Sequence, residues 1–496
     1  MKSLGWIVCM PLMAAYVFAP SWAVAGTTID VAPGADINTL TSSLREGDIV
    51  RFSDGVYEID DTLTWSHVGQ EGNPITLKAA DGARPVIRLI EPGSIVRMSD
   101  AAYVNIEGLT FEGTDIETSW DASALVLERV SNINIKDCII HDKNGHGIYM
   151  ITADRVLVEH TEIYNIFKGY HGIYLDGGIK GGTSYYSSLI TLTNNWIHNL
   201  TGSNSSGVVF SSFVSDSEIS DSVIHSSENR GIYLGTFTDG PANRVERNVV
   251  FNVASAGIEV HGTAVIANNI IFNSNGYGIY STPSKDDDDY QISLVNNTVA
   301  ATLNRAVFYQ HNALDTHLEP QPFRLVNNAL CSPLTYAFKT EKVTESNATM
   351  LQISNNFACG LVETYEGLLP GFQPGAGYAD FVEAATWNFW PSSSSYLIDA
   401  GSGEPADVVP DLDFNGLERS GAPEVGAYER LYNDNPGWVI AEGFKSLEVD
   451  LPDTDVPVET GCQGCKSSSG TPAVFGPSIS IMVGIFLMRR RRLGHR

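Results

Sequence analysis

The apolar and polar positions of this chain are organised around one short phrase that occurs six times. Each copy begins with glycine and continues with Ile or Val, and four copies place tyrosine third. The copies are Gly147–Met150, Gly172–Leu175, Gly207–Phe210, Gly231–Leu234, Gly257–Val260 and Gly278–Ser281. Successive copies start 25, 35, 24, 26 and 21 residues apart. Repeats of this length bury their apolar faces only by stacking on one another, so the pattern predicts a solenoid.

A second alternation of apolar and polar residues precedes each phrase with a period of two, which is the period of a half-buried strand. It covers Ile133–His141, Val156–Tyr164, Ile190–His198, Ile219–His225, Val245–Phe251 and Val265–Phe272. Asparagine pairs recur at one turn position, namely Asn194–Asn195, Asn268–Asn269, Asn296–Asn297, Asn327–Asn328 and Asn355–Asn356. Asparagine tolerates left-handed backbone, and stacked asparagines can hydrogen-bond between coils. Two or three short strands per coil predict an all-β fold, a parallel β-helix.

Composition and charge narrow the range of partners. The formal net charge is −28, so we expect neither nucleic acid nor an anionic membrane surface as a partner. Charged residues make up only 18% of the chain, which also has 46 glycines, and this composition suits a β-rich extracellular protein. A polyanionic substrate would be repelled unless Ca²⁺ or a local basic pocket intervened.

Both ends of the chain have sequence patterns that are typical of targeting signals. Residues 1–25 have the pattern of a secretory signal peptide and end in the small-residue motif Ala23–Ala25. An acidic linker over 433–460 leads to the segment 461–496, in which sixteen mostly apolar residues, Ala473–Met488, precede Arg489–Arg492. A bilayer span needs about twenty apolar residues, and arginines stay on the cytoplasmic side. We expect a secreted protein anchored at the cell envelope, touching the membrane only through this segment; an ordinary single-span tail anchor is the alternative.

The repeated phrase with its asparagine turns, from about Thr28 to Phe357, resembles the right-handed β-helix (pectin lyase-like) superfamily. The opening coils, Gly47–Tyr57 and Gly72–Ile87, are especially similar to its chondroitinase B and alginate lyase group. Near the other end, Leu397–Gly401, Asp411–Gly416 and Gly426–Glu429 resemble the terminal module of anchored bacterial β-helix proteins. The final Cys motif, short span and Arg cluster resemble myxobacterial-type sorting signals. These resemblances imply a right-handed parallel β-helix over 26–390, a cap over 391–432 covering the last coil, and a surface-sorting segment over 461–496.

Four tyrosines occupy the same place in the phrase and are candidates for substrate binding. If the preceding isoleucines point inward, alternation turns Tyr149, Tyr174, Tyr233 and Tyr280 outward, with Glu259 in the same column. Coils stack about 4.8 Å apart, so neighbouring tyrosines would form a ladder whose ring faces suit sugar rings. The alternative is a ladder that only stabilises the stacked strands.

Candidate catalytic residues lie in two adjacent coils that share the motif K-x-x-H-G-I-Y at a spacing of 25 residues. The motif predicts that two lysines, two histidines and two tyrosines form one patch, with an arginine at the histidine position two coils further on and an aspartate beside it. The predicted catalytic residues are Lys143, His146, Lys168, His171, Tyr174 and Arg230, with Asp176 added to the binding residues. Such a basic pocket is what a uronic acid polymer would need.

The enzyme hypothesis is β-elimination. A cation or Ca²⁺ would neutralise the uronate carboxylate, Lys168 or His171 would remove the C5 proton, and Tyr174 would protonate the leaving oxygen. Alternatively, these histidines and lysines cap backbone carbonyls and solvate the rim. The lyase group's Asn-Lys-Ser-type and Leu-Arg-His-Gly segments and the epimerase Asp-Pro-His-Asp pattern are absent, since Glu259–Gly262 lacks the arginine.

A glycosidase is disfavoured, because Asp176 and Glu259 would stand about three coils, or roughly 14 Å, apart, too far for either glycosidase geometry. The sequence therefore predicts a monomer that binds or processes extracellular polysaccharide. A uronate lyase and a structural or adhesion protein without catalysis are the alternatives.

Metal and cysteine chemistry is less defined. The acidic run Lys285–Asp289 could hold Ca²⁺, although a solvated charge run is the alternative, and no His/Cys spacing suggests zinc. Cys331 and Cys359 fall in consecutive repeats and could form a disulfide. Cys138 is expected to pack as a small buried apolar residue.

Overall fold

The structure is a computed structural model that describes residues 26–451, except 117–121, 181–182, 236–239, 283–289, 312–322, 344–347, 349–350 and 364–370. The predicted signal peptide, the acidic run at 285–289 and the sorting segment over 461–496 lie outside the described residues. Within the described ranges, no helix is both long and apolar enough to cross a bilayer.

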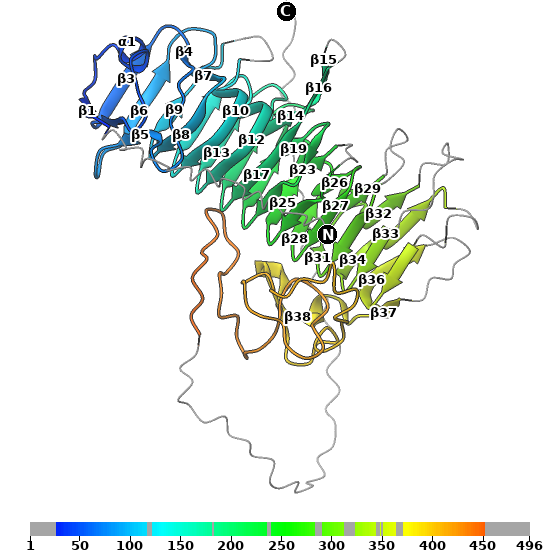
Figure 1. The fold of residues 1–496 in the computed structure, drawn as a ribbon. Coiled ribbons are helices and arrows are strands. Elements are labelled where there is room, and N and C mark those ends of the chain that lie inside the picture. The colour runs from blue at the N-terminus through cyan, green and yellow to red at the C-terminus, as the bar shows by residue number, and fades with distance from the viewer. Residues whose placement is uncertain are drawn as a thin grey trace, which may run out of the picture. The chain divides into compact units, whose positions relative to one another are not determined.

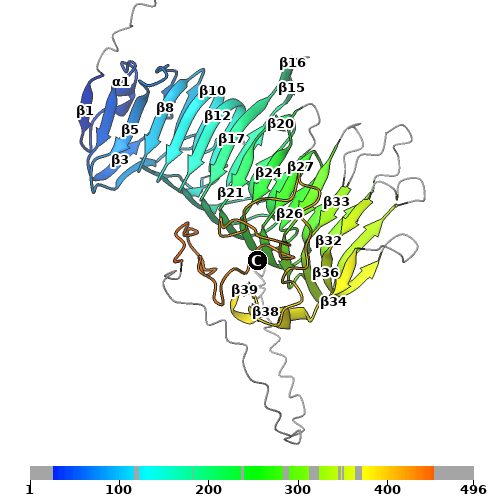
Figure 2. The same ribbon diagram turned by 60° about the horizontal axis from the view of Figure 1, so that its bottom comes forward.

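The described chain forms a right-handed parallel β-helix of about ten turns, which confirms the predicted fold class (Figures 1 and 2). Each coil contributes one strand to each of three sheets, and each strand pairs in parallel with the strand one coil further on. Strand residues of the inner coils therefore have register partners in the coils before and after them. Columns of equivalent side chains run along the solenoid axis.

Chain order within a coil is first sheet, second sheet, third sheet, and four long strands bend from one sheet into another. The first sheet contains β1 (Thr28–Val31), β2 (Ile49–Phe52), β5 (Ile75–Ala79), β8 (Ala102–Glu107), the ends of β10 (Leu125–Lys136) and β12 (Ile148–Glu159), β17 (Ser187–Thr193), β20 (Val214–Ser215), β21 (Glu218–Ser220), β24 (Asn243–Glu246), β27 (Ala264–Ala267), β30 (Ile292–Val295), β33 (Phe323–Val326) and β35 (Leu351–Ser354). The second contains β3 (Gly55–Ile59), β6 (Pro85–Leu89), β9 (Thr110–Glu112), β11 (Ile139–Lys143), β13 (Glu162–Ile166), β18 (Trp196–Leu200), β22 (Val223–Ser227), β25 (Val249–Val253), β28 (Ile270–Ser274), β31 (Thr298–Ala300), the starts of β34 (Ala329–Glu341) and β36 (Asn356–Glu363), and β37 (Phe372–Pro374). The third contains β4 (Leu63–Trp65), β7 (Val96–Ser99), the starts of β10 and β12, β14 (Ile173–Asp176), β19 (Ser206–Phe210), β23 (Arg230–Leu234), β26 (Ile258–Val260), β29 (Tyr277–Ser281), β32 (Arg305–Gln310) and the ends of β34 and β36.

The remaining elements are short. A five-residue helix, α1 (Ile37–Thr41), follows β1, and an antiparallel hairpin, β15 (Gly178–Lys180) with β16 (Thr183–Tyr185), follows β14. The C-terminal region adds η2 (Gly377–Asp380), β38 (Phe381–Glu383), η3 (Ala384–Thr386) and β39 (Asn388–Pro391).

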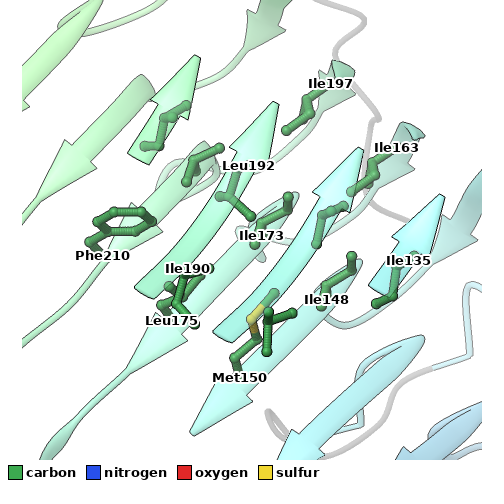
Figure 3. Close-up of a cluster of buried hydrophobic side chains, with 14 of the residues drawn as sticks. Ile135, Ile148, Met150, Ile163, Ile173, Leu175, Ile190, Leu192, Ile197 and Phe210 are labelled. Atoms are coloured by element: carbon green, nitrogen blue, oxygen red, sulfur yellow. The ribbon is translucent and has the colours of Figure 1, made fainter. Parts of the chain in front are cut away.

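Neighbouring coils approach each other closely at the glycine of the repeated phrase. A Cβ on Gly172 would lie 2.6 Å from Gly207 O and 2.6 Å from the Ile197 methyl, and the other copies have the same neighbours. Real Cβ atoms do not approach backbone so closely, so glycine avoids a clash at the six phrase positions, whereas alanine occupies the same column just beyond them, at Ala124 and Ala306. The isoleucine or valine after each glycine is buried, and Figure 3 shows Ile148, Ile173 and their neighbours filling the interior of the solenoid.

The alternating segment before each phrase is two strands rather than one. A corner residue with positive φ divides it, for example Asp137 (φ 53°) between β10 and β11 and Asn194 (φ 50°) between β17 and β18. The period-two pattern continues across the corner because this corner is only two residues long. Each coil therefore has three strands.

The asparagine prediction is confirmed. The first member of each pair has positive φ, while the second is buried and bridges coils. Asn297 shows the pattern, because its Oδ1 accepts the backbone N–H of Asn269 at 3.0 Å and its Nδ2 donates to Asn328 Oδ1 at 3.0 Å. The ladder continues through Asn248 and Asn356.

The C-terminal module lies along the outer face of the second sheet (Figures 1 and 2), whereas the resemblance to terminal modules predicts that it covers the last coil. Its Phe389, Trp390, Phe414 and Tyr428 form one apolar cluster with outward side chains of the second sheet. Those outward side chains are Val223, Val249, Phe251, Ile270 and Phe272. The physical reason is visible in these strands, which are apolar on both faces and would otherwise expose their outer side to water.

The module also extends beyond 432, into the segment expected to be a linker. Lys445 is 3% exposed, and its Nζ donates to Asp221 Oδ1 at 2.8 Å and to Phe414 O at 2.7 Å. Arg247 forms an ion pair with the same aspartate at 2.9 Å. These contacts fasten the C-terminal segment to two coils of the solenoid.

The cysteines of the described chain are free thiols. Cys331 and Cys359 are register partners on adjacent coils, close enough for their side chains to hydrogen-bond. Cys138 is buried as predicted, and burial raises the pKa of its thiol to about 12.

Candidate functional site

The outer face of the third sheet gathers most of the predicted site residues. Tyr149 and Tyr174 are register partners, and Tyr233, Glu259 and Tyr280 continue the same column beyond one valine. All except Tyr149 and Glu259, which are buried, lie half-buried at the surface. The expected outward column therefore exists, because the isoleucine beside each member occupies the core.

The rings of this column stack on one another, which changes what they offer a ligand. The ring centroids of Tyr149 and Tyr174 are 5.6 Å apart with planes 11° from parallel, and Tyr280 stacks on Phe308 at 5.4 Å. The face of Tyr233 is covered by the Arg230 guanidinium, 5.0 Å from its centroid. The expectation that open aromatic faces receive sugar rings is wrong for these tyrosines, because their faces contact neighbouring side chains. Ring edges and hydroxyls remain for a ligand.

His146 and His171 form a second column beside the tyrosines and are buried. Each Nδ1 accepts a backbone N–H from the next coil, His146 from His171 and His171 from Ser206, both at 3.1 Å. The ring proton is therefore on Nε2 in both histidines. Burial, with the nearby Arg230 charge, lowers the pKa of His171 to about 4, and burial lowers the pKa of His146 well below its usual value.

These contacts make the two histidines neutral at physiological pH. Their lone pairs hold the coils in register, so neither can accept a proton from a substrate without losing an inter-coil hydrogen bond. The His146 ring also stacks on Tyr174 at 4.9 Å. In this arrangement the histidines position the tyrosines and can donate through Nε2–H.

The two lysines of the motif do not share a column, so the predicted pairing of Lys143 with Lys168 is wrong. Lys143 is the register partner of Ile166, and the corner after Ile166 is two residues longer than the corner after Lys143. The Lys143 side chain is fully buried, and its Nζ donates to Gly93 O at 2.7 Å. Burial lowers the pKa of Lys143 to about 8. Lys168, by contrast, lies exposed in a turn with φ 60°.

Asp176 joins the tyrosine cluster at the end of β14. Tyr149 Oη donates to Asp176 Oδ2 at 3.4 Å, and the Ser211 hydroxyl hydrogen-bonds with both Asp176 and Tyr174. Burial raises the pKa of Asp176 and of Tyr174 above their usual values, although these hydrogen bonds oppose the shift. Ser211 was not among the predicted residues. It follows Gly207–Phe210, one of the two copies of the phrase without a tyrosine, so the repeat did not indicate it as a site residue.

Two coils further on, Arg230, Glu259 and His261 form a compact ionic group. Arg230 Nε donates to Glu259 Oε2, and His261 Nε2 lies 2.9 Å from Glu259 Oε1. Burial alone would raise the pKa of Glu259, but hydrogen bonds from His261 and Arg230 lower it below its usual value. His261 was missed as a site residue, although its i, i+2 spacing from Glu259 on a strand places both on one face.

The site therefore has two parts on one sheet. His146, His171, Tyr149, Tyr174 and Asp176 meet at its first part. Arg230, Tyr233 and Glu259 meet at its second, with Tyr280 as the next register partner, whose Oη donates to Gln310 at 2.9 Å. Lys143, which is buried, and Lys168, which lies in an exposed turn, are the predicted residues that neither part includes. Among the described residues, no group of three His, Cys, Asp or Glu side chains could hold a metal ion, and the acidic run proposed for Ca²⁺ lies outside them.

Comparison with known proteins identifies the fold, but it finds little sequence similarity. A family model described as "Right handed beta helix region" matches residues 123–299. No curated protein sequence matches this chain. The structure is similar to that of XylC in complex with xylose, with a TM-score of 0.55 and 12% identity over 82% of this chain and 98% of the other.

Two lyase structures show a weaker similarity. Pectate lyase Pel9A has a TM-score of 0.47 and 14% identity, over 82% of this chain and 98% of the other. An alginate lyase from Paenibacillus sp. strain FPU-7 has a TM-score of 0.40 and 13% identity, over 68% of this chain and 98% of the other.

Proposed function

We propose that this protein binds an extracellular polysaccharide along the outer face of the third sheet. The observation that carries the proposal is the row of hydrogen-bonding groups that repeats along the coils. Tyr174 and Asp176 stand at one end, and Tyr233, Glu259 and Tyr280 follow in the same column. The row has the direction of the solenoid axis, so a chain-like ligand could meet one coil after another about 4.8 Å apart.

Sugar hydroxyls both donate and accept hydrogen bonds, and this face offers both. Carboxylate oxygens of Asp176 and Glu259 and the hydroxyl oxygens of the half-buried tyrosines can accept, while the Tyr233 hydroxyl can donate. The stacked rings and inter-coil hydrogen bonds hold these groups in place before a ligand arrives. Binding would therefore cost little side-chain entropy, which favours affinity.

Binding fits these contacts better than catalysis by the predicted residues. Lys143 is inside the solenoid, the Nδ1 atoms of both histidines are occupied, and Arg230 is paired with Glu259. The proposal rests on these side chains, because a fold shared at 12% identity accommodates many chemistries.

A uronate lyase is the second candidate. Tyr174 stays protonated at neutral pH because burial raises its pKa, so it could donate a proton to a leaving oxygen, and the exposed Lys168 is the available base. This candidate requires that Lys168 reach the substrate bound beside Tyr174.

The test is polysaccharide binding by the purified full-length protein, measured by biolayer interferometry with alginate, polygalacturonate, chondroitin sulfate and xylan. We expect Tyr233→Phe and Asp176→Asn each to weaken binding about fivefold, the effect of losing one hydrogen bond. Tyr164→Phe is the matched control, because Tyr164 is also half-buried and stacked, between His141 and His198, but lies on the second sheet.

Binding of none of these polymers, or equal binding by the parent and both site variants, would contradict the proposal and leave a structural or adhesion protein. Ultraviolet absorbance of unsaturated uronate products, recorded in the same samples, tests the lyase. If these products appear with the parent protein and not with Lys168→Ala, the protein is a lyase, and the binding proposal gives way to the lyase.

We also propose that the protein acts outside the cell and is held at the envelope by its C-terminal segment. The support is the sequence pattern at both ends, and cell fractionation with and without residues 461–496 tests it.

A further inference from the structure

A separate groove lies on the outer face of the first sheet, away from the site described above. One hollow of about 500 Å³ is bordered by the turn at Gln70–Pro74 and by Asn105, Asn134 and Thr191. A second hollow of about 230 Å³ shares Leu189 and Thr191 with the first and continues to Glu218 and Arg244. The two hollows are therefore contiguous.

The groove follows the solenoid axis. Asn105, Asn134, Leu157, Thr191, Glu218 and Arg244 are successive register partners on neighbouring coils. Five coil steps of about 4.8 Å give a length of about 24 Å. This shape suits an extended polymer better than a compact metabolite.

The wall of the groove contains strained residues with long side chains. Tyr103, Arg155 and Leu189 have φ of 54°, 52° and 56° at the corner that leads into the first sheet, and all three line the first hollow. Left-handed backbone costs about 1–2 kcal/mol for such residues, whereas Asn132, in the same column, adopts it readily. Leu189 is also 38% exposed. Positive φ recurs at corners along the described solenoid, for example at Arg129 and Arg247, so the strain by itself does not mark a site; here it places three long side chains along the wall of the hollow.

The lining combines amide groups with apolar surface, and its charged side chains give no net positive charge, since Glu71, Asp216 and Glu218 accompany Arg155 and Arg244. Asn134 Nδ2 donates to Asn105 Oδ1 at 2.9 Å, which leaves Asn105 Nδ2 and Asn134 Oδ1 without another protein partner among the described residues. Arg155 is paired with Asp154, and Arg244 with Glu246. Amides suit vicinal hydroxyls, and leucines suit the C–H faces of sugar rings. A groove without net positive charge does not suit a polyuronate.

We propose that this groove binds a neutral polysaccharide chain and that it is a second binding site, independent of the third sheet. The chain lies along the coils, with its ring faces against Leu157 and Leu189 and its hydroxyls on Asn105, Asn134 and Thr191. The acidic lining residues disfavour uronate polymers in the same groove.

The decisive variant is Leu189→Gly, because a purely structural role of Leu189 and a role in ligand contact predict opposite effects of this substitution. Glycine adopts positive φ without steric cost, so a purely structural residue would tolerate the change or gain stability. A ligand contact would be lost. Thr152→Gly is the matched control, since Thr152 also has positive φ (56°) but lies outside both hollows.

Binding of xylohexaose, cellohexaose and hexagalacturonate to the full-length protein is measured by isothermal titration calorimetry. We expect a neutral hexasaccharide to bind, Leu189→Gly and Asn134→Ala to weaken its binding about tenfold, and Thr152→Gly and Tyr164→Phe to leave it unchanged. Thermal unfolding of Leu189→Gly at or above the parent's temperature shows that the loss is not misfolding. The proposal is overturned if no neutral hexasaccharide binds, if Leu189→Gly binds like the parent, or if hexagalacturonate is the sugar lost in that variant. Weakening of polymer binding by Tyr233→Phe but not by Leu189→Gly reports on the third-sheet proposal alone, and weakening by Leu189→Gly but not by Tyr233→Phe reports on this groove alone.

Discussion

The substitution Gly231→Ala tests the closeness of the coils, on which both proposed surfaces depend. Gly231 belongs to the glycine column of the repeated phrase and lies in β23, between Arg230 and Tyr233. Alanine can adopt the backbone conformation of Gly231, but a Cβ there would lie 2.3 Å from Val250 Cγ1 and 2.6 Å from Gly257 O. That carbonyl accepts the Ile232 N–H at 2.9 Å, so it cannot turn away without breaking the ladder between coils.

The expected magnitude follows from two opposing terms. Overpacking of a tight interior costs about 1–3 kcal/mol, and the upper end applies because one clash is with hydrogen-bonded backbone. Replacing glycine by alanine also removes about 0.4–1 kcal/mol of unfolded-state entropy, which opposes the loss. We therefore expect the free energy of unfolding to fall by about 2 kcal/mol.

The assay is urea unfolding followed by tryptophan fluorescence, with hydrogen exchange of the peptides that contain β23 and β26. Because neighbouring coils stabilise one another, exchange should accelerate in both strands. Gly403→Ala is the control, since a Cβ at Gly403 meets nothing within 4 Å. If Gly231→Ala unfolds at the urea concentration of the parent and exchange is unchanged, steric closeness does not explain the glycine column.

Two further predictions concern the buried hydrogen bonds. His171→Asn should flatten the pH dependence of stability, because Asn Oδ1 can accept the Ser206 N–H without titrating. The pKa of His171 is about 4 in the fold, below the usual 6.5, so the unfolded chain binds more protons between these values. In the parent, the stabilisation that neutral His171 contributes is complete above pH 6.5 and is lost as the pH falls towards 4. Urea midpoints of both proteins, measured across this pH range, test this expectation. If the two proteins lose stability in parallel, the expectation is refuted. Asn297→Ala should destabilise the protein by about 3 kcal/mol or more, because buried groups such as the Asn269 N–H and the Ile266 carbonyl lose their partner. A midpoint like that of the parent would show that water replaces the side chain.

Much of the fold could be predicted because its information is local and periodic. Glycine, isoleucine and an outward residue recur at a spacing that stacking requires, so the solenoid, the tyrosine column and the asparagine ladder are readable from residue order. The Tyr149–Tyr174 alignment follows from equal spacing within two copies of the phrase. Each of these features depends on one strand and its immediate neighbour.

The candidate site was predictable only in part, because its chemistry depends on corner length and ring orientation. The two extra residues between Ile166 and Ile173 move Lys168 out to solvent, while Lys143 enters the interior. The two copies of the motif are 25 residues apart, and this spacing does not show how the residues divide between strands and corners. Ring stacking likewise decides that the tyrosines present edges.

The sequence by itself determined the parallel β-helix and which residues face outward, since both follow from the period of the apolar pattern. Only the tertiary structure decided where the C-terminal module lies, that the histidines are neutral, and that a groove follows the first sheet. These features join segments far apart in the chain, as when Lys445 meets Asp221 or the turn at Gln70–Pro74 borders a groove that reaches Leu189. Burial and shape of this kind arise from packing between distant segments, which a local repeat does not encode.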